Sequence, residues 1–278
     1  MRLSIVVITF NSQASIRACL DSIMRQDARD IEIVVVDNDS RDQTREIIKT
    51  HFPGVNLIEN PKNFGASKAR NQGIEGSSGD WVLALDNDVV LGDGFLAEFE
   101  RIRKGFSEDV GMIQPNVLSA DGKTVYSQGI HLSACRRFHD LNQGKPKDGP
   151  GLAGKKIIGP CSAAAFYRRA MLNAIREKTG YFDERFFFLV EDVDLAWRAS
   201  RAGWQAQFCP DMTCCHAGNS SDTGGKFRQY LCFRNRHWMI QKNEDLLGKI
   251  RVYALFLPYE LVRCFYLAVS NKYFWTRP

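Results

Sequence analysis

Short apolar strands alternate with helical segments over roughly the first 90 residues, and this alternation limits the possible folds more than any other feature. The predicted strands are the apolar, β-branched runs at residues 3–9, 31–36, 56–59 and 81–85. Helices are predicted from a cap at Asn11 or Ser12 to about Arg25, and over residues 42–51 and 66–74. This order predicts an α/β fold with a doubly wound, Rossmann-like sheet, in which ligands bind beyond the carboxyl ends of the strands.

Polar side chains stand where three of these strands end. Asn11 follows the first strand, Asp37 the second and Asp86 the fourth. Because the carboxyl ends of parallel strands meet at one edge of a sheet, we expect these side chains to converge on one crevice.

Asp86 and Asp88 are carboxylates two residues apart, separated by Asn87, at the end of a buried strand. Such a pair suits a hard divalent cation, Mg²⁺ or Mn²⁺, because carboxylate oxygens bind the cation while positions remain open for diphosphate oxygens. A turn with helix-capping aspartates is the alternative interpretation of these residues taken alone.

A second acidic cluster follows the aromatic run at residues 186–188. Asp194 and Arg198 are four residues apart on a helix predicted over residues 192–202, and we interpret them as a structural ion pair. Glu191 and Asp192 stand at the start of that helix. They are either N-terminal capping residues or a general base and its neighbour, with at least one pKa raised by the aromatic surroundings.

The composition is that of an ordinary globular protein, with 44% hydrophobic and 25% charged residues, and it excludes disordered and collagen-like classes. Eight cysteines without a C-x-x-C pair, and an apolar N-terminal run without a cleavage site, favour a cytosolic protein with free thiols. The spacing of Cys209, Cys214, Cys215 and His216 matches no common zinc finger, so buried thiols are the favoured interpretation. Residues 120–156, rich in Gly, Pro and Lys, are expected to form a surface excursion or mobile loop.

The last 53 residues differ in charge from the rest of the chain. Residues 226–278 hold ten Lys/Arg and three acids, a net charge of +7, whereas residues 1–225 hold 27 basic and 29 acidic residues. Beyond Pro258, helical spacing places Glu260 and Arg263 on one side and Leu261, Phe265 and others on the opposite side. This amphipathic helix either packs its apolar face on the catalytic domain or a second subunit, or lies peripherally on an anionic membrane. The charged and proline-interrupted stretch is a poor transmembrane helix.

Seven motifs, in a fixed order over residues 3–240, resemble those of the family 2 glycosyltransferases, and most closely the rhamnosyltransferase-like branch. They are Val-Val-Ile-Thr-Phe-Asn at 6–11, Val-Val-Asp-Asn-Asp-Ser at 35–40, Asn63-Phe64-Gly65-x-x-x-Ala69-x-Asn71-x-Gly73, Asp86-Asn87-Asp88, Phe182-Asp183-Glu184, Glu191-Asp192-x-Asp194-Leu195 and His216-x-Gly218-x-Ser220.

The resemblance implies a GT-A fold in residues 1–225, with a nucleotide-binding part to about 115 merged with an acceptor-binding part, followed by a helical C-terminal region. It implies an inverting transfer from a dTDP- or UDP-type sugar donor, rhamnose being favoured, to a glycan or lipid-linked acceptor. The N-terminal pattern and the basic C-terminal region place the expected reaction at the inner face of the membrane. The implied donor-site residues are Thr9, Asn11, Asp37, Asn38, Asn63, Asn71, Asp86 and Asn87. Asp88, Asp86 and His216 would bind Mn²⁺ or Mg²⁺, Asp192 would be the catalytic base, and Glu191 would help to place the acceptor.

Other functions fit the residues less well. A glycosidase needs a protonated acid beside its leaving oxygen and no metal–diphosphate site. A nucleotidyltransferase would need a Gly-rich phosphate loop after the first strand, where Asn11-Ser12-Gln13 stands. A non-catalytic nucleotide- or glycan-binding module would not need the second acidic cluster, and no nucleic-acid-binding motif accompanies the basic C-terminal region. A homodimer remains compatible with the sequence.

Overall fold

The structure is a computed structural model that describes residues 2–28, 30–149, 151–152, 155–218 and 224–276. Its first half contains β1 (Leu3–Thr9), α1 (Ile16–Met24), β2 (Ile31–Asp37), α2 (Thr44–His51), β3 (Asn56–Glu59), α3 (Ala66–Glu75), β4 (Trp81–Asp86), β5 (Val89–Leu91), α4 (Phe95–Ile102), η1 (Arg103–Gly105) and β6 (Val110–Ser119). Its second half contains β7 (Val125–Ser127), β8 (Ile130–Leu132), β9 (Phe138–Asp140), β10 (Ala164–Arg168), α5 (Arg169–Ala174), η2 (Glu184–Phe186), α6 (Glu191–Arg201), β11 (Gln205–His216), α7 (Gly225–Asn243), α8 (Leu246–Ser270) and η3 (Lys272–Phe274).

The described chain forms one large sheet in the order β3-β2-β1-β4-β10-β6-β11-β5, with β7 paired to β6. β1 pairs in parallel with β2 and β4, and β2 pairs in parallel with β3, which confirms the predicted doubly wound arrangement. β10 runs antiparallel to both β4 and β6. The second half of the chain therefore extends the sheet of the first half, and the two halves share one structure.

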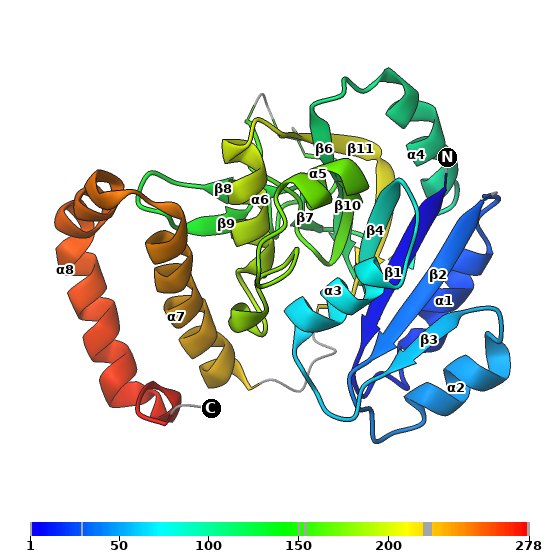
Figure 1. Cartoon of the computed structure of the whole chain (residues 1–278), viewed down its shortest axis with the longest axis horizontal. Coiled ribbons are helices and arrows are strands. Elements are labelled where there is room, and N and C mark those ends of the chain that lie inside the picture. Colours follow the sequence, from blue (N-terminus) through cyan, green and yellow to red (C-terminus); the bar gives the residue numbers. More distant parts are fainter. Residues whose placement is uncertain (1, 29, 150, 153–154, 219–223, 277–278) are drawn as a thin grey trace.

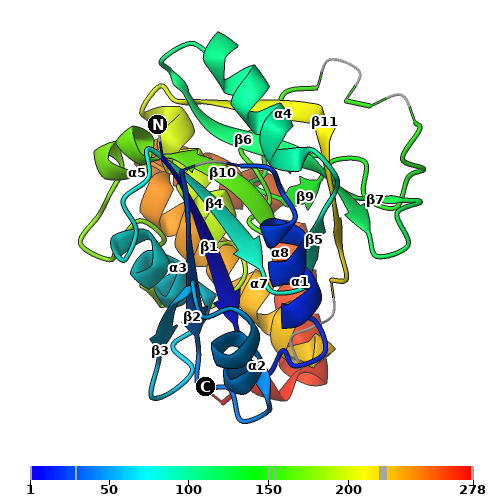
Figure 2. The same cartoon turned by 90° about the vertical axis from the view of Figure 1, so that its right-hand side faces the viewer.

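Helices cover both faces of the sheet because the side chains of each strand alternate between two apolar clusters. Leu3, Ile5 and Val7 of β1 pack with α1, α2 and α4. Val6 and Ile8 pack with α3, α5 and α6 on the opposite face. Figure 2 shows β1 between α3 and α1.

The helix predicted after the first strand begins later than expected. The predicted cap at Asn11 or Ser12 is wrong, because α1 begins at Ile16 with Ser15 as its N-cap. Asn11 has a left-handed φ of 50°, and the backbone N–H of Ser12 donates to Thr44 Oγ1 at 2.7 Å. Asn11 and Ser12 therefore form a turn that is hydrogen-bonded to the start of α2. Because this turn ends before α1 begins, Ser12 does not cap the helix.

The region expected to be an irregular excursion contains three strands. β7 extends the main sheet beside β6, and β8 pairs with β9 as a hairpin. β7 and β8 each begin with a buried apolar residue, Val125 and Ile130. The pairing of β7 with β6 and of β8 with β9 outweighs the Gly- and Pro-rich composition that suggested a loop.

The C-terminal region forms two long helices, and Figure 1 shows α8 running beside α7 at one edge of the molecule. α8 is a single helix that passes through Pro258 and begins twelve residues before it, at Leu246. Its length and composition are sufficient to cross a membrane, contrary to the expectation from the sequence, and only 11% of its apolar window is buried.

The side of α8 that faces the protein bears Val252, Glu260 and Leu267, and the predicted apolar side faces outward. Glu260 is buried and accepts from Arg236 of α7 at 2.7 Å, and Asn271 donates to the carbonyl of Lys226 at 2.7 Å. Leu261 and Phe265 are 60% and 72% exposed. The alternative in which this apolar face packs on the catalytic domain is therefore wrong for the described chain.

Candidate active site

Asp86, Asp88 and His216 form a compact group of potential cation ligands. Asp86 ends β4 and Asp88 follows it, while the pairing of His216 with Val89 brings the end of β11 beside them. One ligand atom from each residue lies within 4.8 Å of the others. The Nε2 atom of His216 is 3.1 Å from Asp88 and 3.9 Å from Asp86. Ser220, the last residue of the His216 motif, lies outside the described residues.

The electrostatics of this group suit a bound cation. Burial alone lowers the pKa of His216, but the hydrogen bond to Asp88 and the charges of both aspartates outweigh it and raise that pKa. Burial also raises the pKa of Asp86, against the opposing charge of Arg70. Two carboxylates and an imidazole that stabilise positive charge between them are a donor set for Mn²⁺ or Mg²⁺.

Arg70 connects this group to the second acidic cluster, and sequence reasoning missed it. Its buried guanidinium donates to Asp86 at 2.8 Å and to Glu191 at 2.7 Å. It also donates to the carbonyl of Ser162 at 3.3 Å. Arg70 stands at an unassigned position of the Asn63–Gly73 motif, and its place beside Asn71 in a buried helix was the only available signal.

Glu191 and Asp192 occupy the first turn of α6, where Val190 is the N-cap. Glu191 is buried, and burial raises its pKa to about 7 although Arg70 opposes the shift. This confirms the expectation that one carboxyl here has a raised pKa. Asp192 is half-buried and accepts from the N–H of Ser162 at 3.1 Å and of Val193 at 2.8 Å.

Residues of both acidic clusters line one cavity of about 580 Å³, but the buried Asp88 is not among them. The predicted residues that line it are Thr9, Asn11, Asn38, Asn63, Asp86, Asn87, Glu191, Asp192 and His216. The cavity thus lies at the carboxyl ends of β1, β2 and β4, as the strand-end pattern predicted, and Asp192 also lines it.

Two predicted donor-site residues do not line this cavity. Asp37 is fully buried below it and accepts from Arg45 at 2.5 Å and from the N–H of Ser40 at 3.0 Å. Asn71 donates to the carbonyl of Phe182 at 2.8 Å and accepts from its N–H at 2.9 Å. Both side chains hold neighbouring segments in place, which a motif of residue types cannot reveal.

The wall opposite the strand ends comes largely from the region expected to be a loop. Tyr126, Phe138 and Asp140 line the cavity. The ring of Tyr126 packs edge-on against His216, with centroids 4.3 Å apart. Burial raises the pKa of Asp140 to about 6, although Ser127 donates to its carboxylate at 2.6 Å. Nothing in the local sequence distinguished Asp140 from a solvent-exposed turn residue.

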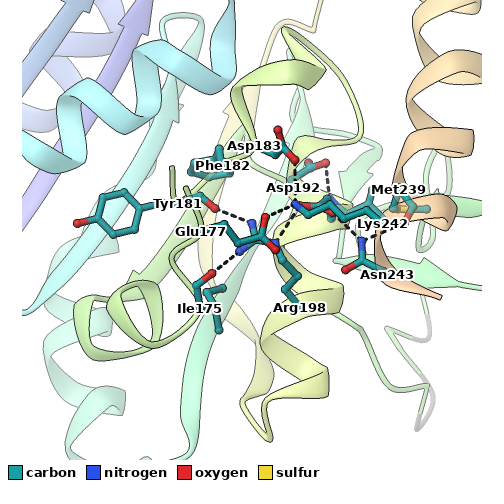
Figure 3. A network of polar contacts seen from close by, with 12 residues as sticks. Ile175, Glu177, Tyr181, Phe182, Asp183, Asp192, Arg198, Met239, Lys242 and Asn243 are labelled. Carbon is teal, nitrogen blue, oxygen red and sulfur yellow. Dashed lines mark hydrogen bonds and ion pairs between the residues drawn. The ribbon is translucent and has the colours of Figure 1, made fainter. Parts of the chain in front are cut away.

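A buried ionic network docks α7 beside the acidic cluster (Figure 3). The predicted ion pair between Asp194 and Arg198 is confirmed at 2.9 Å. Lys242 of α7 places its ammonium 2.8 Å from Asp194, 3.0 Å from Asp183 and 2.7 Å from Glu177. The first helix of the C-terminal region is thereby joined to the helix that bears Asp192.

Sequence comparisons identify relatives over most of this sheet. The family described as Glycosyl transferase family 2 matches residues 4–176. A PGL/p-HBAD biosynthesis glycosyltransferase of Mycobacterium tuberculosis is 31% identical over 175 residues, which are 62% of this chain and 61% of that protein, so the match spans less than two thirds of that relative. An N-acetylglucosaminyl-diphospho-decaprenol L-rhamnosyltransferase of the same species is 25% identical over 237 residues, 77% of this chain and 75% of that protein.

The fold is also shared with a solved glycosyltransferase. The mannosyltransferase PcManGT from Pyrobaculum calidifontis, in complex with GDP-Man and Mn²⁺, superposes with a TM-score of 0.62 at 18% identity, covering 98% of this chain and 76% of that one. From the family match over residues 4–176 and this shared GT-A architecture, the chain belongs to glycosyltransferase family 2.

Proposed function

We propose that this glycosyltransferase is metal-dependent and inverting, and that it moves a sugar from a nucleoside-diphosphate donor to an acceptor hydroxyl. The observation that supports this most is that Asp86, His216 and Asp192 line one cavity, with Asp88 buried within ligand distance of the first two. A divalent cation held by the first group would neutralise charge on the departing diphosphate.

Other residues of the cavity would bind the sugar donor or act on the acceptor. Thr9, Asn11, Asn38 and Asn63 offer polar groups at the strand ends for the nucleoside, and Asn87 lies between the two aspartates. Asp192, half-buried and lining the cavity, takes the proton from the attacking hydroxyl. Attack from the face opposite the leaving diphosphate inverts the anomeric carbon, because no covalent sugar–enzyme intermediate intervenes. Glu191 is held away from this role by its ion pair with Arg70 and helps to shape the acceptor side.

We further propose that the donor is a dTDP- or UDP-sugar, with rhamnose favoured, and that the acceptor is a glycan or lipid-linked sugar of a cell-surface polysaccharide. The relative named as a rhamnosyltransferase acting on a decaprenol-linked sugar supports this choice. All eight cysteines are free, which fits a protein at the inner face of a membrane.

Contact with that membrane is assigned to α8. Every residue of this helix is described, and Arg251 is the only charged residue among its exposed positions. The exposed apolar residues are Leu246, Leu247, Ile250, Leu255, Leu257, Leu261, Val262, Phe265, Tyr266 and Val269. The surrounding C-terminal region has a net charge of +7, so an anionic lipid surface complements it better than a second copy of the same basic region.

Product analysis tests the transfer. The full chain is incubated with UDP-, dTDP- and GDP-sugars, with Mn²⁺ or with EDTA, and the released nucleotide is identified. We expect a nucleoside diphosphate with Mn²⁺ and none with EDTA, whereas release of pyrophosphate would show nucleotidyl transfer and exclude the proposal. Asp192→Asn should keep the donor affinity and lose turnover, because an amide preserves the shape but cannot accept the proton.

A further inference from the structure

The segment from Phe186 to Val190, which leads into α6, has an unfavourable backbone. Phe187, Leu189 and Val190 have left-handed φ values of 65°, 67° and 75°, and none is glycine. The left-handed region is especially unfavourable for a β-branched residue such as Val190. Residues in this conformation are strained and persist only where surrounding contacts hold them. The course of residues 186–190 therefore depends on the contacts that the rest of the protein makes with them.

One side chain of α7 supplies most of those contacts. The amide nitrogen of Asn235 donates to the carbonyls of Phe186, Phe188 and Leu189, at 3.0, 2.9 and 2.7 Å. Its amide oxygen accepts from Nε of Arg234 at 3.0 Å, which fixes the orientation of the amide. Asn235 is fully buried.

The chemistry of this contact requires an amide. A primary amide presents two N–H donors and an acceptor oxygen in a compact group, so with one N–H shared between two carbonyls it can serve all three and still accept from Arg234. A carboxylate of the same shape would repel the carbonyls. An alanine would leave the carbonyls of Phe188 and Leu189 without this donor, whereas the carbonyl of Phe186 would still accept from Arg234 and from the N–H of Phe188.

The held segment forms the cavity wall and ends directly at the catalytic acids. Phe187, Phe188 and Leu189 line the cavity, and Glu191 and Asp192 follow Val190. On its other side, the carbonyl of Phe187 accepts from the N–H of Ser67 at 3.3 Å. A displacement of this segment would therefore move Asp192 relative to the strand ends where the donor binds.

We propose that Asn235 is a positioning residue that holds residues 186–190 in their left-handed course and thereby sets the position of Asp192. The proposal rests on the function proposed above, in which Asp192 is the base. It makes α7 a component of the active site, although Asn235 lies outside the cavity.

The test compares two buried amides of the same helix in the full-length chain. Asn235→Ala removes the hold on residues 186–190, while the control Asn243→Ala removes a buried amide that donates to Asp194 and the carbonyl of Met239. We expect Asn235→Ala to lower kcat about 100-fold, the effect of a displacement of about 1 Å at a reacting group. The Kd of the sugar donor should stay at the wild-type value, because the residues proposed to bind the nucleoside lie in other segments of the chain. Asn235→Ser, which keeps one donor, should fall between Asn235→Ala and wild type.

Two further measurements separate this proposal from the assignment of the base. Amide hydrogen exchange should accelerate over residues 186–190 in Asn235→Ala and stay at the wild-type rate in Asn243→Ala. A wild-type kcat in Asn235→Ala, or equal losses in both alanine variants, would overturn the positioning role. If Asp192→Asn transfers sugar at the wild-type rate, the base assignment fails, and the hydrogen-exchange result still decides whether Asn235 holds the segment.

Discussion

At the scale of single residues, Asp86 has two different partners. One of its oxygens accepts from Arg70 at 2.8 Å, and the other lies 3.9 Å from His216. Arg70 in turn holds the buried carboxylate of Glu191 at 2.7 Å. Because an uncompensated buried charge is costly, these four side chains depend on one another for their positions. The group of Asp86, Asp88 and His216 is therefore joined to Glu191 through one guanidinium.

Asp88 provides the clearest single-residue test of the cation site. A nucleoside diphosphate at 100 times its Kd should stabilise the chain by about 2.7 kcal/mol, which raises the melting temperature by roughly 5–10 °C. We expect this rise with Mn²⁺ in the wild type and none in Asp88→Ala, because a charged ligand of the cation is lost. Differential scanning fluorimetry measures it, with Asp93→Ala as the exposed control. An Mn²⁺-dependent rise that survives in Asp88→Ala would contradict the metal assignment.

Residue types at strand ends could be predicted, and long-range partners could not. Asn11 and Asp86 were found from sequence because parallel strands bring their carboxyl ends together. Asp37 and Asn71 carry the same kind of side chain, yet each is used by a distant backbone or side-chain group. Arg70 was missed for the converse reason, since its importance comes from carboxylates 16 and 121 residues away.

At the scale of elements, α7 is fixed by charges that are buried against α6 and the turn before it. Burial raises the pKa of Asp183, but hydrogen bonds from Arg185 and Lys242 outweigh this and hold the pKa well below its usual range. Sequence periodicity predicted the Asp194–Arg198 pair because both residues lie on one helix. It could not predict Lys242 as their partner, because that contact depends on how α7 packs on α6.

The depressed pKa of Asp183 gives an acid-dependent stability. A group whose pKa is lower in the folded than in the unfolded state stabilises above its unfolded value, about 3.9, and loses this contribution as pH falls. We expect Asp183→Asn to lower the free energy of unfolding by roughly 1–3 kcal/mol at pH 6 and to flatten its decline toward pH 3. Urea unfolding across this range measures both. The exposed Asp93→Asn serves as control, and an unchanged pH slope in Asp183→Asn would refute the expectation.

At the scale of the whole molecule, the apolar side of α8 forms an outer surface. The opposite side faces the protein because its Glu260 forms an ion pair with the buried Arg236 of α7. Sequence spacing predicted the two sides of this helix correctly. It could not predict which side faces the protein, since that depends on a buried guanidinium 24 residues earlier. The contiguous exposed side chains exceed what scattered surface residues of a monomer explain.

Vesicle flotation tests what covers this surface. The full chain should float with liposomes in proportion to their anionic lipid, while a chain with Leu261→Ser, Phe265→Ser and Val269→Ser should bind at least about 100-fold more weakly. Met24→Ser, at a 58% exposed residue of α1, is the control. Equal flotation of all three would exclude α8 as the contact. A concentration-dependent dimer that only the triple substitution dissolves would identify a second copy as the occupant.

The outward position of this apolar surface also bears on which acceptor concentration sets the rate of transfer. With α8 embedded in a leaflet, the enzyme and a lipid-linked acceptor would meet by lateral diffusion, and the tether would raise their effective concentration without adding a contact. The rate would then follow the number of acceptors per unit area of membrane. Diluting the acceptor with inert lipid at constant bulk concentration would slow transfer, whereas diluting the whole suspension with buffer would leave the turnover of each bound enzyme unchanged.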